Sequence, residues 1–210
     1  MTHTLHAKSI PDLAAYQTRQ VGNTCSFHAI ATALHMLLDY SLDPHALSAE
    51  VNRLWWRGRF MRVAPNWAVT PRMQVRTVRH LAKTHALPVT AELYHGNSAM
   101  LLALLANTQR RCVPIITLIW SWGQAPPIYL GDTAQNFNAV RSAGGHSMIL
   151  AAYDRNHTAA DQFPTPWGFI NPWKSNAEHL FWMTDADFRK AWRFPLPWVG
   201  PNPVVLIKAK

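Results

Sequence analysis

The chain has 210 residues and a formal net charge of +9; 49% of its residues are apolar and 15% are charged. This length fits one domain, residues 1–210, and the apolar content supports a sizeable core, which excludes an intrinsically disordered chain. No apolar run approaches the roughly 18–20 residues of a membrane-spanning helix. No apolar signal segment is visible near the first residue, and two cysteines are too few for a disulfide framework. We therefore expect a cytoplasmic protein with free thiols and no membrane span.

Apolar spacing predicts four helices in the first half of the chain. After the candidate N-cap Thr24, apolar side chains recur every three and four positions. Asp43 before Pro44 and Thr70 before Pro71 are typical of helix starts, because proline is favoured at the first helical position. The predicted helices span residues 25–40, 44–57, 71–85 and 99–109, the last with Ser98 as its candidate cap.

The second half of the chain is dominated by short apolar runs that predict strands. These runs span residues 113–120, 147–153, 167–170, 179–183 and 203–208. One short helix, residues 185–192, is expected after the candidate cap Thr184. Residues 124–143 have no clear period and read as a long loop, a kind that is often functional. Helices followed by strands predict an α+β fold, with N-terminal helices packed on a C-terminal antiparallel sheet.

Three short segments carry residues with catalytic chemistry. The segment Gln20-Val-Gly-Asn-Thr-Cys25 leads directly into the first predicted helix. Gly144-Gly145-His146 stands directly before a predicted strand, and Asn171-Pro172-Trp173 directly follows another. Each segment alone has an ordinary structural interpretation as core, strand edge or turn. Their order along the chain favours nucleophilic catalysis.

The chemistry links these segments. A thiol at a helix N-terminus feels the positive end of the helix dipole, which lowers its pKa, and the thiolate is the nucleophile. A histidine beside Cys25 takes and returns the proton, and an Asn171 carbonyl can hold the far nitrogen of His146. Gln20 and the Cys25 backbone N–H can form an oxyanion hole, while Trp173 can cover the His–Asn pair. The other cysteine, Cys112, opens an apolar strand and reads as core.

The three segments resemble those of the papain-like cysteine peptidases. In that family a Gln, a Cys at the start of the central helix, a His on a later strand and an Asn or Asp follow in this order. Asn171-Pro172-Trp173 matches the Asn-x-Trp of the papain group. The Gly-Gly-His segment and the strand after it are most similar to the bacterial branch that includes double-glycine leader peptidases. The sequence departs from the family in two places: Gln20 stands five residues before Cys25 instead of six, and Cys25 is followed by Ser26-Phe27 instead of Gly.

The resemblance implies a papain-like fold and the hydrolysis of peptide or isopeptide bonds through a thioester. Cys25 would be the nucleophile, His146 the general base and acid, Asn171 the orienting residue and Gln20 an oxyanion donor. The expected substrate is a peptide or protein, and no cofactor is implied.

Two other kinds of chemistry use these residue types. Acyltransferases, transglutaminases and phytochelatin synthase-like enzymes have the same order of residues but transfer the acyl group to an amine or thiol. A zinc site is the second, since Cys25 and His28 lie three residues apart on one predicted helix and would need two further ligands. Metal binding is the weaker hypothesis, and we expect no metal.

The positive charge is concentrated in residues 51–91, which contain no acidic residue. Arg72, Arg76, Arg79 and Lys83 follow at spacings of four, three and four, which places them on one face of a helix. We call these four residues the basic stripe. They predict either a solvated helix face or a contact surface for an anionic partner, and an anion-binding protein without catalysis is a third functional hypothesis.

Overall fold

The computed structural model describes residues 2–57, 69–109, 111–138, 140–174, 178–193 and 200–210. Its helices are α1 (Ile10–Ala14), α2 (Cys25–Leu38), α3 (Pro44–Arg53), α5 (Pro71–Thr84), α6 (Ser98–Ala106) and α7 (Asp185–Trp192), with 3-10 turns at Leu5–Ala7 and Trp55–Arg57. Its strands are β1 (Thr2–Thr4), β2 (Val89–His95), β3 (Cys112–Trp120), β4 (Tyr129–Leu130), β5 (Gly144–Asp154), β6 (Thr158–Ala159), β7 (Phe163–Pro164), β8 (Trp167–Ile170), β9 (Phe181–Met183) and β10 (Pro203–Ala209).

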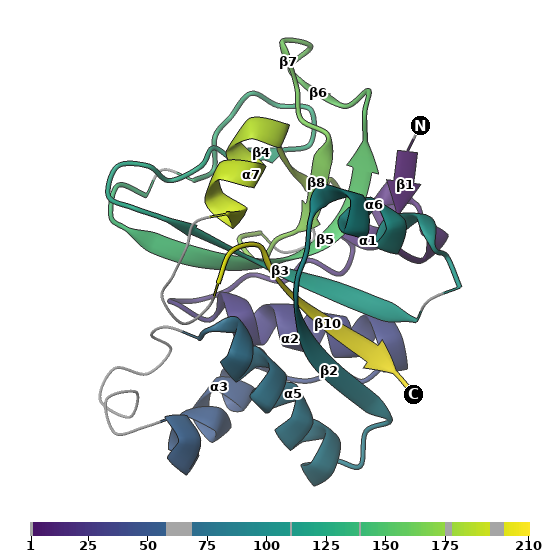
Figure 1. The fold of residues 1–210 in the computed structure, drawn as a ribbon, viewed down its shortest axis with the longest axis vertical. Helices are drawn as coiled ribbons and strands as arrows, with labels where there is room; N and C mark the ends of the chain where they lie inside the picture. The colour runs from purple at the N-terminus through teal and green to yellow at the C-terminus, as the bar shows by residue number, and fades with distance from the viewer. Residues whose placement is uncertain (1, 58–68, 110, 139, 175–177, 194–199) are drawn as a thin grey trace.

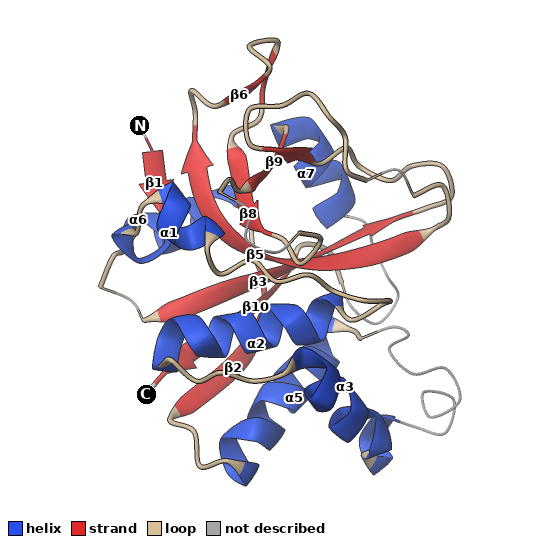
Figure 2. Ribbon diagram, turned by 180° about the vertical axis from the view of Figure 1, so that it is seen from behind, coloured by secondary structure: helices blue, strands red, loops and turns tan. Residues whose placement is uncertain are grey.

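One large antiparallel sheet organises the molecule. Its strands follow the order β2-β10-β3-β5-β8-β9-β4, and β1 pairs with β5 outside this path. Helices α2, α3 and α5 gather at one end of the molecule, and α7 lies with β8 and β9 at the other, while the long strands β3 and β5 cross between them (Figures 1 and 2). The predicted α+β class is confirmed.

Helix α2 lies between the sheet and the other helices. It packs on β3, β5 and β10, and on α3 and α5 (Figure 2). Its residues from Ser26 to Leu34 are all buried, including the small side chains on the side away from its main apolar stripe. The sequence predicts this deep burial, because both sides of the helix carry small or apolar residues. The first residue of α2 is therefore held by packing along the whole helix.

The cap residues decide where the other helices begin. Asp43, Thr70 and Thr184 each accept a hydrogen bond from a backbone N–H of the first turn, as predicted. Helix α6 begins one residue before the predicted start, because the Asn97 side chain, and not Ser98, accepts from Met100 N–H. Helix α3 ends at Arg53, and a separate 3-10 turn follows where a continuous helix is predicted.

The main difference from the predicted order of elements is β2. Residues 89–95 follow α5 in the half of the chain that reads as helical, yet they pair along their whole length with the last strand, β10. Val89 and Ala91 are buried, and Thr90 between them and Glu92 after them are half-exposed, the alternation of a strand with one covered face. The sheet therefore contains β1 and β2 from the first half of the chain in addition to the strands of the second half.

Within the described residues, no helix combines the length and the apolar character needed to cross a lipid bilayer.

Candidate active site

Cys25 is the first residue of α2, and no side chain caps this helix. Thr24 has φ −108° and ψ 12°, and its hydroxyl donates to the Val21 carbonyl at 3.0 Å instead of accepting from the first turn. Thr24 therefore occupies the predicted N-cap position, but its side chain does not cap the helix. The backbone N–H groups of Cys25 and Ser26 instead face the Cys25 sulfur, where they lower its pKa. The start of α2 thus presents free donors beside a thiol.

The Cys25 thiol nevertheless keeps a pKa above its ordinary value of 9.0. Burial of the sulfur is the largest cause and disfavours the thiolate. The Ser147 backbone N–H and the Ser26 hydroxyl oppose it by hydrogen bonding to the sulfur. The expected lowering by the helix start is thus outweighed. The Cys25 residue as a whole is nevertheless partly exposed, whereas Cys112 is buried, so Cys25 is the more accessible of the two cysteines.

His146 and Asn171 form the expected pair. The Nε2 atom of His146 lies 2.8 Å from Oδ1 of Asn171. Strand β8 runs antiparallel to β5 with Ile170 opposite Ile149, so Asn171 returns beside the start of β5. A carbonyl oxygen only accepts, which places the proton on Nε2 and leaves Nδ1 as the basic atom of the neutral ring.

This pair is shielded from water. His146 is 4% exposed and Asn171 is fully buried. The Trp173 ring stacks on the His146 ring with centroids 4.4 Å apart and an interplanar angle of 24°, which is the cover predicted from Asn171-Pro172-Trp173. Burial lowers the pKa of His146 to about 4, and the hydrogen bond that its Nε2–H donates to Asn171 acts in the opposite direction. His146 is therefore neutral at neutral pH.

The residues next to Cys25 and His146 connect these two side chains. The hydroxyls of Ser26 and Ser147 are 3.0 Å apart and form a buried hydrogen bond between α2 and β5. The Ser147 N–H also faces the Cys25 sulfur. The contacts of the described residues include no hydrogen bond between the Cys25 sulfur and the His146 ring. Their direct pairing stays a prediction.

Gln20 lies where the first and third segments meet. Its backbone N–H donates to the Pro172 carbonyl at 2.7 Å, so the loop before α2 runs beside Asn171-Pro172-Trp173. Its side-chain Nε2 donates to the Gly22 carbonyl at 3.0 Å. One amide hydrogen of Gln20 is therefore used within its own loop. The oxyanion role of Gln20 stays a prediction that rests on the second hydrogen.

A second glutamine, Gln17, lies in the same region, and no motif in the sequence indicates its role. Gln17 is buried and lies eight residues before Cys25. Its Nε2 donates to the His179 carbonyl at 2.8 Å, and its Oε1 accepts from the Asn171 backbone N–H at 3.3 Å. Gln17 therefore holds the backbone of the residue that orients His146. It belongs to no motif, and only the fold brings it to Asn171.

A buried polar cluster behind Cys25 and His146 was also missed. Gln74 projects from α5 into a group of three hydroxyls on α2, β3 and β5, those of Ser26, Thr117 and Ser147. All four residues are at most 8% exposed. The only signal in the sequence is the polar character of Ser26, Thr117 and Ser147 in otherwise apolar elements.

The two glycines before His146 serve the sheet. A Cβ at Gly145 would come within 3.2 Å of the Leu118 carbonyl, and one at Gly144 within 3.2 Å of the Trp120 ring. Both glycines lie in β5, paired with the end of β3. They allow β5 to approach the neighbouring strand β3 closely.

No group of three or more His, Cys, Asp or Glu side chains with metal-binding geometry occurs in the described part of the chain. His28, the residue considered as a partner of Cys25 in a metal site, has its Nδ1 atom 2.7 Å from the Thr18 hydroxyl. Burial lowers the pKa of His28 to about 4.

The basic stripe lies on the outer face of α5. All four side chains are exposed, as predicted. Arg79 donates to the Ala91 carbonyl of β2 at 3.4 Å. Residues 51–91 contain four further arginines: Arg53 is exposed, Arg57 is buried against Asn52 and Met73, and Arg59 and Arg62 lie outside the described residues.

No protein-family model matches this chain, and no curated protein matches it.

Proposed function

We propose that this protein is a papain-like cysteine peptidase that hydrolyses peptide or isopeptide bonds. The observation that carries the proposal is the buried 2.8 Å bond between His146 and Asn171 beneath the stacked Trp173 ring. His146 lies on β5 next to Ser147, whose N–H faces the thiol at the start of α2, and Asn171 directly follows β8. The resemblance of the three sequence segments to the double-glycine-peptidase-like branch agrees with it.

The reaction begins with proton transfer from the Cys25 thiol to Nδ1 of His146. The sulfur attacks the carbonyl carbon of the scissile bond, and the carbonyl oxygen becomes an oxyanion. The Cys25 N–H and one Gln20 amide hydrogen donate to this oxygen. His146 then gives its proton to the departing amine, and the acyl group remains on Cys25 as a thioester.

Water completes the cycle. His146 takes a proton from a water molecule, the hydroxide adds to the thioester carbon, and the carboxylic acid leaves while the sulfur regains its proton. Asn171 Oδ1 accepts from Nε2–H throughout, so the imidazolium formed in each half-reaction keeps its orientation. No cofactor enters either half-reaction.

The neutral states of Cys25 and His146 define when the charges appear. Burial raises the pKa of the thiol and lowers that of the imidazole, so both groups rest uncharged. The imidazolium–thiolate pair then forms only as the sulfur attacks. We therefore assign His146 the role of a general base during attack, and the free enzyme does not store a preformed thiolate.

The test is a thiol-directed electrophilic probe combined with a peptide library. The probe should label Cys25, as mapped by mass spectrometry, and library products should carry new carboxyl termini. Library cleavage that labelling of Cys25 does not abolish would contradict the proposal. Products joined to an added amine instead of water would identify the protein as an acyltransferase with the same residues.

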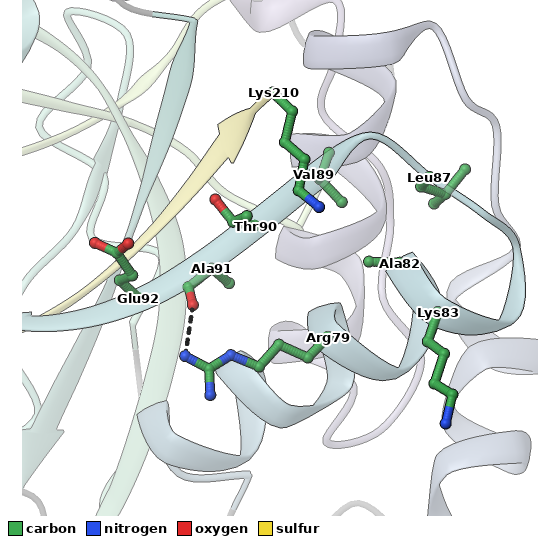
Figure 3. Close-up of a pocket in the computed structure, with 9 residues that line it drawn as sticks. All are labelled: Arg79, Ala82, Lys83, Leu87, Val89, Thr90, Ala91, Glu92 and Lys210. Atoms are coloured by element: carbon green, nitrogen blue, oxygen red, sulfur yellow. Dashed lines mark hydrogen bonds between the residues drawn. The ribbon is translucent and has the colours of Figure 1, made fainter.

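We also propose that the basic stripe contacts an anionic partner or an acidic part of the substrate. Its four cations form no ion pair with any described residue. The end of the stripe borders a cavity of about 400 Å³ between α5 and β2. Figure 3 shows Arg79 reaching toward Ala91 and Lys210 extending along β2, while the acidic side chain at this cavity, Glu92, is bonded to Lys208 and also interacts with the charge of Arg79. Basic side chains therefore outnumber acidic ones in the cavity lining.

A further inference from the structure

Gln74 lies at the centre of the polar cluster behind Cys25 and His146. It is fully buried on the inner face of α5. Its Nε2 atom is 2.9 Å from the Ser147 hydroxyl, 3.1 Å from that of Ser26 and 3.2 Å from that of Thr117. One side chain therefore contacts α2, β3 and β5 at once.

The hydroxyls are also bonded to one another. Ser147 lies 3.0 Å from Ser26 and 3.2 Å from Thr117, oxygen to oxygen. Ser26 directly follows Cys25 on α2, and Ser147 directly follows His146 on β5. The cluster is thus one residue away from each of the two reacting side chains.

The hydrogens can be assigned from the chemistry of the groups. An amide nitrogen only donates, so Gln74 Nε2 gives its two hydrogens to hydroxyl oxygens. A hydroxyl that accepts in this way keeps its own hydrogen to donate elsewhere. Ser26 has the Cys25 sulfur beside it and donates to it. A continuous path of donors therefore runs from Gln74 through Ser26 to the sulfur.

The orientation of Gln74 leaves its carbonyl unused. Oε1 is buried and has no hydrogen-bond partner within the described residues. An unsatisfied buried acceptor is uncommon and requires a reason. The placement of Nε2 among the hydroxyls supplies that reason, since the reversed amide would draw the hydroxyl hydrogens toward Gln74 and away from Cys25.

We propose that Gln74 is a positioning residue of the active site, which turns the Ser26 hydroxyl toward the Cys25 sulfur and holds Ser26 and Ser147 in register. This inference rests on the proposed function, because it assigns a role relative to Cys25 and His146. The groups that face the Cys25 sulfur are donors of α2 and β5. The arginines of α5 lie on its opposite, exposed face.

The experiment replaces Gln74 by methionine, which has similar length and no donor. The rate of Cys25 alkylation by iodoacetamide is measured against pH, together with kcat and KM for a peptide from the library. Without the donor path, the alkylation profile of Gln74→Met should move to higher pH. Its kcat should fall about tenfold, the equivalent of one lost hydrogen bond to the transition state, with KM little changed.

Thr77→Val is the matched control. Thr77 lies three residues further along α5, is fully buried, and its hydroxyl has no hydrogen-bond partner among the described residues. This variant also removes a buried polar group from the same helix, but it leaves the cluster intact. It should keep the wild-type alkylation profile and kcat.

Three outcomes are decisive. A folded Gln74→Met variant with unchanged alkylation profile and kcat but lower thermal stability would reduce Gln74 to a structural residue and overturn the proposal. If Gln74→Met does not fold, Ser26→Ala decides, because loss of the relaying hydroxyl must also move the alkylation profile to higher pH. A wild-type protein that cleaves no peptide would instead contradict the proposed function, while the alkylation profile would still report on Gln74.

Discussion

The two faces of helix α5 differ sharply. Its inner face places Gln74 and Thr77 at zero exposure, with Gln74 bonded to three hydroxyls. Its outer face carries the basic stripe, which is exposed along its whole length. Polar groups on the two faces lie only one or two residues apart in the sequence. The fold, and not residue type, separates them.

This difference determines how far the effect of a substitution should extend. In the buried cluster a lost partner leaves another group unsatisfied, which costs about 1–3 kcal/mol, and the geometry at Cys25 and His146 changes with it. On the exposed face, water and salt screen each charge, so neighbouring groups feel little. Substitutions around the cluster should therefore alter chemistry, and substitutions in the stripe should alter only the choice of partner.

The largest effect is expected for Cys25→Ala. Removal of the nucleophile should lower kcat by roughly 10⁴-fold or more while the protein stays folded, because the sulfur forms the covalent intermediate. Steady-state turnover measures the loss of activity, and circular dichroism shows whether the variant is folded. The matched control is Cys112→Ala, which changes a buried cysteine on β3 and should keep turnover. Turnover that survives Cys25→Ala would place the chemistry elsewhere.

A smaller loss is expected for Asn171→Ala. Without Oδ1 the His146 ring loses its partner at Nε2, and misorientation of a catalytic group by about 1 Å costs roughly 100-fold. The loss should appear in kcat and not in KM. Asn138→Ala is the control, since Asn138 is also buried but bonds the Pro126 carbonyl in the loop before β5. Equal losses in both variants would mean that Asn171 acts only through stability.

Acid should destabilise the fold through two buried histidines. Burial lowers the pKa of His146 and of His28 from 6.5 to about 4. Between these pH values the two histidines bind protons in the unfolded chain but stay neutral in the folded chain. The free energy of unfolding therefore falls as the pH drops from 6.5 to 4. Each histidine contributes about 3 kcal/mol at most.

Urea unfolding at several pH values measures this slope. His28→Leu removes one of the two groups without touching the His146–Asn171 pair, so the dependence of stability on pH should become shallower. An unchanged slope in this variant would contradict the assignment of a neutral buried His28.

The sequence predicts the site best where neighbouring strands decide the contacts. β5 and β8 are neighbours in the sheet, and antiparallel pairing returns Asn171 to His146 without help from the rest of the chain. The stacking of Trp173 follows from its place two residues after Asn171. The spacing of residues in the sequence and the pairing of β5 with β8 are therefore enough to predict how His146, Asn171 and Trp173 lie together.

Contacts between distant elements are not predictable in this way. Gln17, in the loop after α1, reaches Asn171, and Gln74, on α5, reaches Ser147, although both contacts join parts of the chain far apart in the sequence and neither glutamine belongs to a motif. The pKa of Cys25 shows the same limit. The helix-start argument uses local donors and predicts a lowered value, whereas burial by the surrounding fold raises it. Strand β2 is identified only once β10, more than a hundred residues later, pairs with it.

The smallest effect on chemistry is expected for the basic stripe. Arg72→Glu, Arg76→Glu and Lys83→Glu together reverse three exposed charges and leave Arg79, which bonds the Ala91 carbonyl, in place. Turnover of a small uncharged peptide should stay within about twofold of wild type, because exposed charges are screened beyond roughly 10 Å at 0.1 M salt.

Binding of poly-glutamate, measured by fluorescence anisotropy, should be lost in the triple variant, and in the wild type it should weaken steeply as salt rises. Wild-type protein that binds no poly-glutamate even at low salt would leave the stripe as a solvated surface. Loss of small-peptide turnover in the triple variant would remove the distinction between the two faces of α5, since the outer charges would then act on the same chemistry as Gln74.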